Sequence, residues 1–249
     1  MARVRSGLHT VEGIPVAVES KPVRHLRLSL RPPEGAVHVT APRGVPWPEV
    51  ASFVRAHVDW IRRKQREMAA RPRPAPRLWA DGEPLRVHGK DYVLRLVPSR
   101  RFFLTFDGTD AVFECPAAAT PYHRGARLAL WMRHLLEDDL ATLVPEAERL
   151  AGEHCGDWRI RDMTTRWGTC AVRKRRIWLA LALATVPEDC IRYVCVHELC
   201  HFARPRHDAA FRAALDRALP GWRALDRFLD AQPMRRVGPP PLRGAPGGE

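Results

Sequence analysis

The residues best suited to chemistry lie in one short segment, which holds two histidines, a glutamate and a third histidine. His197 and His201 are separated by one turn of an α-helix, so their side chains project from the same face. Two neutral imidazoles placed in this way can bind one zinc ion at about 2.0–2.1 Å. Glu198 can reach a water whose pKa the zinc lowers to about 7 and accept its proton. The pattern predicts a zinc hydrolase in which Glu198 is the general base.

The third metal ligand comes from the chain that follows this helix. A catalytic zinc takes three protein ligands and keeps one position open, and Pro205 forces the chain to turn, so His207 can fold back to the metal. The spacing between His201 and His207 equals that of metzincins, but Arg204 replaces their glycine, which disfavours that class. Three carboxylates compete with His207 as the third ligand: Asp208, Asp216 and Asp226.

The elements that must position these residues are also visible in the sequence. Residues 187–204 are apolar almost all round, which predicts a helix enclosed by a core. Residues 177–184 alternate in size and predict a buried strand before it. Asp208 is expected to cap a following helix over 209–219. Cys200 precedes His201 by one residue and projects about 100° away from it, so we exclude it as a ligand. Cys170 is interpreted as a core thiol.

A second motif precedes the zinc helix and carries a family resemblance. Arg166-Trp167-Gly168-Thr169-Cys170 resembles the Arg-Trp-Gly-Ser-Cys signature of YgjP-like, SprT-related zinc metallopeptidase domains, with threonine replacing serine. The zinc-helix residues His197, Glu198 and His201 also match that family, and His207 matches its third-ligand histidine. Segments 23–30 and 41–45 resemble the family's amino-terminal hairpin. The resemblance covers most of residues 15–230.

The resemblance implies an α+β fold with a gluzincin-like zinc-helix core, in which the preceding strand borders a cleft. We expect a small β-rich amino-terminal module over 1–120, the catalytic domain over 121–231, and a Pro/Gly/Arg-rich disordered tail over 232–249. In this interpretation Arg166 binds a substrate carbonyl or carboxylate and Trp167 forms a wall of the cleft. The alternative for Trp167 is a purely structural role in a tight packed turn.

The remaining patterns outline the rest of the chain. Alternating residues predict a hairpin within 26–39 and further strands within 78–115. Helical spacing predicts a helix over 50–68 and a long helix over 128–150, interrupted or kinked near Pro145. No internal repeat and no phosphate-binding glycine loop are evident.

Charge and cysteine usage bear on partners and compartment. Lys and Arg number 41 against 28 Asp and Glu, which gives a net charge of +13. Only four of the basic residues are lysine, so the excess fits either the coding composition of the source or contacts with phosphates. The start of the chain lacks an apolar signal stretch, and no segment is long enough to cross a membrane. Six cysteines without a Cys-x-x-Cys pair are interpreted as reduced thiols, and we expect a cytoplasmic protein.

Three functional hypotheses follow. The first is a zinc metallopeptidase whose substrate is a peptide or an unfolded protein. The second is a metal-dependent phosphoanhydride (nucleotide) hydrolase, in which Arg166 and the run 173–176 neutralise phosphate charge. The third is a nucleic-acid-associated SprT-like protein with a structural zinc. Four protein ligands would favour the third, whereas three ligands and a water favour catalysis. The sequence leaves the substrate, the physiological metal and the oligomeric state open.

Overall fold

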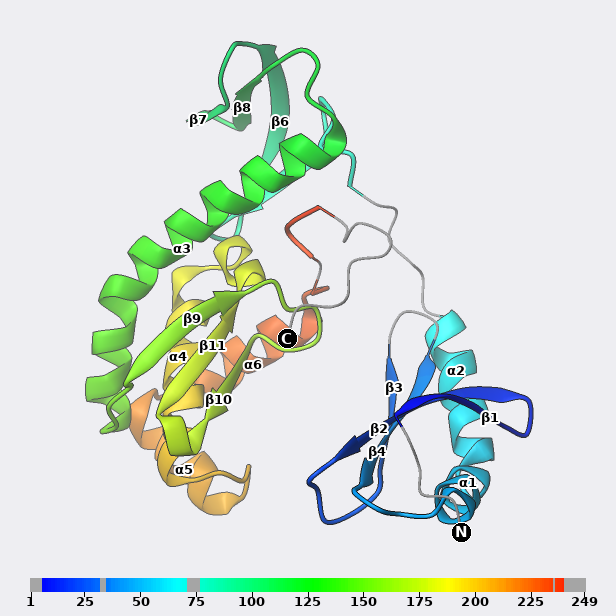
Figure 1. Cartoon of the computed structure of the whole chain (residues 1–249). Coiled ribbons are helices and arrows are strands. Elements are labelled where there is room, and N and C mark those ends of the chain that lie inside the picture. Colours follow the sequence, from blue (N-terminus) through cyan, green and yellow to red (C-terminus); the bar gives the residue numbers. More distant parts are fainter. Residues whose placement is uncertain (1–5, 32–34, 71–76, 235, 240–249) are drawn as a thin grey trace. The chain divides into compact units, whose positions relative to one another are not determined.

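The computed structural model describes residues 6–31, 35–70, 77–234 and 236–239, and shows a mixed α+β fold. The chain divides into two compact units, Met1–Ala75 and Pro76–Glu249 (Figure 1). This division comes earlier than the expected boundary at residue 120, because buried residues of 85–115 share one hydrophobic core with the helices that follow. Part of the expected tail, residues 240–249, lies outside the described residues.

The first unit is a four-stranded sheet followed by two helices. Its core consists of buried aliphatic side chains from both, among them Val16, Val39, Val54 and Ile61, which are fully buried. The helix predicted over 50–68 is two helices in the structure, and a turn at residues 56–57 separates them. The elements are β1 (Gly7–Val11), β2 (Ile14–Lys21), β3 (Arg27–Arg31), β4 (Ala36–Pro42), α1 (Trp47–Arg55) and α2 (Val58–Ala70).

The second unit combines a four-stranded sheet, a long helix, a three-stranded sheet and three further helices. Its strands are β5 (Pro84–Val87), β6 (Lys90–Pro98), β7 (Phe103–Asp107), β8 (Asp110–Cys115), β9 (Asp157–Arg161), β10 (Gly168–Ala171) and β11 (Arg176–Ala180). Its α-helices are α3 (Pro121–Ala151), α4 (Glu188–Ala203), α5 (Ala209–Ala218) and α6 (Trp222–Ala231). No helix in the described parts of the chain is both long enough and apolar enough to span a bilayer.

The two four-stranded sheets repeat one topology, a feature that the sequence did not reveal. Their orders are β1-β2-β4-β3 and β5-β6-β8-β7, and in each the central pair is parallel and the outer pairs are antiparallel. The first hairpin of each turns at two residues with positive φ, Glu12-Gly13 and His88-Gly89. Only glycine adopts such angles freely, so Gly13 and Gly89 suit these positions.

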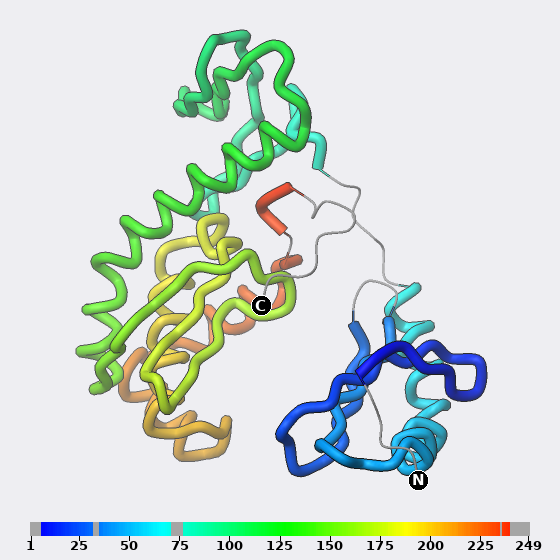
Figure 2. Tube along the Cα trace, viewed as in Figure 1, coloured from blue at the N-terminus to red at the C-terminus, as the bar shows by residue number. Residues whose placement is uncertain are grey.

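The long helix α3 spans the second unit (Figure 2). It begins after Thr120, whose side chain accepts a hydrogen bond from the His123 N–H, and ends at the left-handed residue Gly152. The helix continues through Pro145, which was expected to interrupt or kink it. It packs against α4, and Glu146 near its carboxyl end pairs with Arg192 of α4, so it supports the helix that carries the candidate ligands.

The three-stranded sheet β10-β11-β9 covers another side of α4, and its strand β10 is an edge. The strand predicted over 177–184 is only partly correct, because β11 ends at Ala180 and Leu181–Thr185 form a 3₁₀ helix. This turn places the carbonyls of Ala184 and Thr185 where they accept hydrogen bonds of 3.0 Å from the His88 and Gly89 N–H groups. Alternation in size alone does not distinguish a buried strand from such a turn.

Candidate metal centre

Helix α4 presents the candidate catalytic residues from inside the second unit. It runs from Glu188 to Ala203, one residue shorter at each end than the predicted 187–204, with Pro187 at its N-cap and Arg204 at its C-cap. The helix contacts α3, α5, α6 and strands β10 and β11, which explains why it is apolar nearly all round. Glu198 and His201 are only 6% and 8% exposed. Burying these polar side chains is costly without a partner, so their position requires an explanation.

The chain reversal after α4 brings a third histidine to the first two. The Nε2 atom of His207 lies 3.0 Å from Nε2 of His197 and 3.1 Å from Nε2 of His201. Asp208 stabilises the chain reversal between α4 and α5, because its carboxylate caps α5 by accepting a hydrogen bond of 3.0 Å from the Phe211 N–H. One nitrogen from each histidine lies within 4.8 Å of the others, as in a site that holds one metal ion.

The two helix histidines each use their second ring nitrogen, Nδ1, in a contact that orients the ring for metal binding. Nδ1–H of His201 donates to the Arg204 carbonyl at 3.0 Å. The Tyr193 hydroxyl donates to Asp226 Oδ1 at 2.8 Å, so its oxygen can accept from Nδ1–H of His197 at 3.3 Å. In both rings the proton therefore belongs on Nδ1, and the Nε2 lone pair faces the cluster. The donor set of three imidazoles fits zinc.

The carboxylates that compete with His207 are engaged elsewhere. Asp208 caps α5, and Asp216 accepts from Trp222 Nε1 at 2.9 Å and pairs with Arg223. Asp226 holds the Tyr193 hydroxyl. The geometry therefore favours His207 over all three as the third ligand.

Burial also sets the charge state of the histidines. It lowers the pKa of His197 to about 3, with a further contribution from the neighbouring His201 and His207. It also lowers the pKa of His201. Both rings are therefore neutral near pH 7, and a neutral imidazole is the form that binds a metal.

Glu198 lies beside the histidines in the wall of a cavity of about 480 Å³. Burial raises the pKa of its carboxyl group to about 7, although a hydrogen bond with Cys170 and the charge of Arg166 act in the opposite direction. Burial and the nearby carboxylate raise the pKa of the Cys170 thiol to about 12, so this thiol stays protonated. The cavity is lined by Arg166, Gly168, Thr169, Cys170, Val172, His197, Glu198, His201, Pro205 and His207.

Strand β10 approaches Glu198 so closely that its first residue must be glycine. A Cβ atom on Gly168 would lie 2.7 Å from Glu198 Oε1 and 2.9 Å from Val194 Cγ1. Both distances are shorter than side chains tolerate, and Val194 belongs to the same buried helix. The glycine of the Arg166–Cys170 motif therefore fixes the carboxylate by close packing.

The two residues expected to contact substrate lie on different cavities. Arg166 is exposed and lines the metal cavity, where its charge acts on Glu198. Trp167 is half-buried, packs against the core and lines a neighbouring cavity. Its carbonyl accepts a hydrogen bond of 2.8 Å from the Ala180 N–H, so it also helps to hold the turn. Cys200, which we excluded as a ligand, is buried and does not line the metal cavity.

The sequence did not indicate three features of this centre: the Tyr193–Asp226 pair behind His197, the contact of Gly168 with Glu198, and the thiol of Cys170 beside the same carboxylate. Tyr193 lies four residues before His197, a spacing that places both on one helix face and was a usable signal. The contacts with Gly168 and Cys170 depend on how β10 packs on α4, which no local pattern gives.

A buried glutamate beside three convergent histidines, on a helix backed by a small mixed sheet, is a metallopeptidase-type arrangement. The chain belongs to the YgjP-like family, whose metallopeptidase domain model matches residues 26–232. Among solved structures, the crystal structure of the metallopeptidase zymogen of Pyrococcus abyssi abylysin is similar over 36% of this chain and 92% of that one. The two are 22% identical, with a TM-score of 0.34. The search of curated proteins found no match.

Proposed function

We propose that this protein is a zinc-dependent peptidase with a gluzincin-like core, in which Glu198 is the general base. The observation that carries the proposal is the convergence of three histidine Nε2 atoms in the same cavity as a buried glutamate. His197, His201 and His207 would hold the ion. Zinc, when bound there, would lower the pKa of a water and polarise the scissile carbonyl.

Glu198 suits both proton transfers that peptide hydrolysis requires. A buried carboxylate beside the metal cavity can accept the proton of the attacking water and return it to the leaving amine nitrogen. The Cys170 thiol donates a hydrogen bond that steadies the carboxylate, and Gly168 prevents it from moving back toward the strand. Positioning of this kind favours transfer over a short fixed distance.

The edge strand β10 offers a place for an extended substrate. It pairs with β11 on one side, and Gly168, Thr169 and Cys170 line the metal cavity. Backbone groups of an edge strand can pair with an incoming peptide. A peptide held there would lie next to Glu198, and Arg166 could bind one of its carbonyl oxygens. The substrate that fits is therefore an extended peptide or an unfolded protein.

The charge distribution gives less support to the other two hypotheses. Arg166 is the one Arg or Lys among the described residues that line the metal cavity. In the run 173–176, Arg175 pairs with Glu153 at 2.8 Å and Arg176 with Asp157 at 2.6 Å. These ion pairs reduce the charge available to phosphates. The six free cysteines agree with the reducing cytoplasm that we propose from the sequence.

Comparison of wild-type protein with Glu198→Gln tests the proposal. The variant should keep its zinc and its melting temperature but lose about 10²–10⁴-fold in hydrolysis of an unfolded protein, because only the proton acceptor is removed. Glu137→Gln, the same change on α3, is the control and should behave as wild type. Nucleoside triphosphates are assayed in parallel. Equal peptide hydrolysis by wild type and Glu198→Gln at matched zinc content would refute the proposal, and hydrolysis of triphosphates alone would replace it.

A further inference from the structure

A second cavity adjoins the metal cavity and shares three residues with it: Gly168, His197 and Glu198. Its volume is about 160 Å³. The two cavities therefore meet at the group that we propose as the general base. A substrate carbonyl placed beside Glu198 would leave the neighbouring side chain of the substrate at the entrance of this second cavity. We call it the side pocket.

The side pocket has apolar and aromatic walls. Trp167 comes from the turn before β10, Tyr193 and Val194 come from α4, and Leu229 comes from α6. Tyr193 and Leu229 are each 3% exposed, so these walls are held rigidly by the core. Walls of this kind suit the aliphatic stem of a long side chain, and aromatic rings also attract cations.

The charged groups of the side pocket are all negative. Asp226 and Asp230 line it, and its lining includes no Arg or Lys among the described residues. They are four residues apart on α6, where like charges are neighbours and destabilise one another. In a chain whose net charge is +13, a pocket with this lining is a local exception.

Both carboxylates keep oxygen atoms available for a ligand. Asp226 accepts the Tyr193 hydroxyl with Oδ1, while within the described residues Oδ2 has no hydrogen-bond donor or cation. Asp230 forms no ion pair with a described residue. A second metal site does not explain the pair, because in the described parts of the chain only the three histidines bring three metal-ligand atoms within 4.8 Å of one another.

We infer that the side pocket binds the side chain of a lysine or arginine next to the scissile bond, with its stem between Trp167 and Tyr193 and its charge beside Asp226 and Asp230. This inference deepens the proposed peptidase function and rests on it, because only a peptidase would cleave the bond next to the bound side chain. Recognition of the cation itself depends only on the pocket. Asp230 is a specificity residue, whereas Asp226 also supports the metal ligand His197 through Tyr193.

A pair of small ligands tests the pocket without turnover. Nα-acetyl-arginine amide and its neutral isostere Nα-acetyl-citrulline amide are titrated calorimetrically into zinc-loaded, full-length protein. We expect the arginine amide to bind about tenfold more tightly, as for a charge-assisted hydrogen bond. Asp230→Asn should reduce this ratio by about 2- to 5-fold, since the group is exposed. Asp138→Asn, an exposed position on α3 outside the pocket lining, should leave the ratio unchanged.

The double variant Asp226→Asn/Asp230→Asn should bind the two amides equally. Its zinc content and melting temperature are measured beside its binding, because Asp226 also holds Tyr193. Equal binding of the two amides by the wild type would overturn the inference. A preference that survives the double variant would also overturn it, because recognition of the cation would then not depend on Asp226 and Asp230.

Mapping of cleavage sites separates this inference from the proposed function. Peptides released from an unfolded protein are identified by mass spectrometry, and the cuts should concentrate beside Lys and Arg in the wild type and less so in Asp230→Asn. Cuts without that preference, together with equal amide binding, refute the side pocket and leave the peptidase standing. A preference for the arginine amide without any cleavage has the opposite meaning: it supports the pocket and refutes the peptidase.

Discussion

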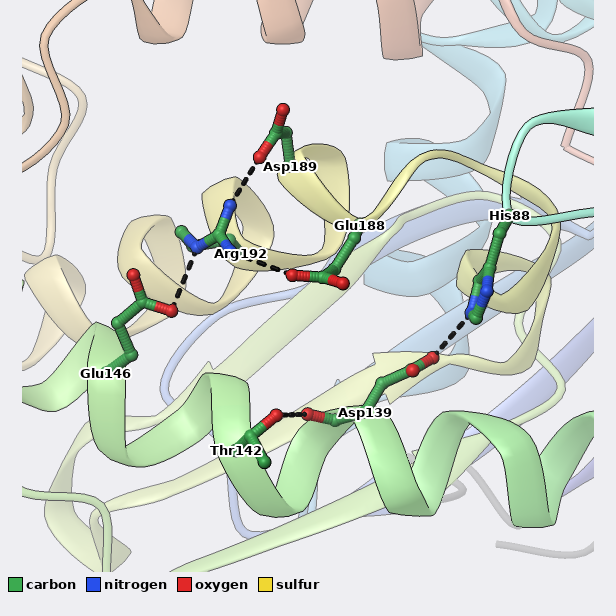
Figure 3. A network of polar contacts seen from close by, with 7 residues as sticks. All are labelled: His88, Asp139, Thr142, Glu146, Glu188, Asp189 and Arg192. Carbon is green, nitrogen blue, oxygen red and sulfur yellow. Dashed lines mark hydrogen bonds and ion pairs between the residues drawn. The ribbon is translucent and has the colours of Figure 1, made fainter.

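The two ends of helix α4 differ in whether their ionisable side chains form ion pairs. Near the amino end, Arg192 pairs with Glu146 of α3 at 3.0 Å, with Glu188 at 2.8 Å, and with Asp189 (Figure 3). Near the carboxyl end, Glu198 is 6% exposed and its hydrogen-bond partner is a neutral thiol. The charges at the amino end are therefore paired within the protein. At the carboxyl end the charge of the exposed Arg166 acts on Glu198, but Glu198 forms no ion pair with a described residue.

This difference separates structural charges from functional ones. Paired charges hold α4 against α3 and need no ligand. Burial raises the pKa of Glu198, although the charge of Arg166 opposes it, and burial lowers the pKa of His197. Perturbed groups of this kind gather at functional sites. A metal ion would supply the missing partner for the histidines. Substitutions at the two ends should therefore affect different properties.

The largest effect is expected at the histidines. His201→Ala should reduce zinc from about one ion per chain to almost none, because two remaining ligands do not make a tetrahedral site. The same change should lower the melting temperature in excess zinc, since a ligand that binds only the folded state stabilises it. Elemental analysis and calorimetry measure both. Wild-type protein purified without chelators that contains no transition metal would contradict the metal centre itself.

The next effect sharpens the role of the glutamate. Gly168→Ala should displace the Glu198 carboxylate, since its Cβ would lie 2.7 Å from Oε1. We expect turnover to fall by about 10²–10⁴-fold, as if the base were lost, while the three histidines still bind zinc. Gly7→Ala is the control, because its Cβ would come within 4 Å of one atom of the described residues, His9 Nε2, at 3.9 Å. Full peptidase activity in Gly168→Ala would show that the position of Glu198 is not critical.

A smaller effect is expected behind the ligand His197. Tyr193→Phe removes the hydroxyl that accepts a hydrogen bond from Nδ1–H of His197. Loss of a group that orients a metal ligand should weaken zinc binding about tenfold, the lower end of the usual range. Competition with a fluorescent chelator measures this affinity. Tyr122→Phe, at a position 42% exposed, serves as the matched control. Unchanged affinity in Tyr193→Phe would reduce the Tyr193–Asp226 pair to a packing role.

The smallest effect on the metal centre is expected from a substitution near the amino end of α4. Arg192→Met keeps the apolar stem but leaves Glu146 without its cation, and should cost about 1–3 kcal/mol of folding free energy. Zinc per chain and turnover of the folded protein should not change. Chemical denaturation gives the first quantity and elemental analysis the second. Loss of zinc at temperatures where the variant is folded would show that the two ends of α4 are coupled.

The comparison also shows which parts of the molecule a sequence can predict. The helix carrying His197 and His201, its end at Arg204 and the cap at Asp208 were predicted because local rules determine them. The break at residues 56–57 and the 3₁₀ turn at Leu181–Thr185 were missed, since packing overrides the local pattern there. The repeated strand order was missed because the two segments show no evident sequence repeat that would indicate it. The side pocket joins residues from 167 to 230, so only the folded chain brings them together.

The most direct test of the account is anomalous diffraction at the zinc edge from crystals of the zinc-loaded protein. We predict one strong peak in the second unit, at about 2.0–2.1 Å from a nitrogen of His197, His201 and His207. The fourth position should hold no protein atom, and Glu198 should lie beside the ion without binding it. A fourth ligand from the chain, such as the Cys170 thiol, or a peak bound by Asp226 in place of His207, would contradict the catalytic centre described above.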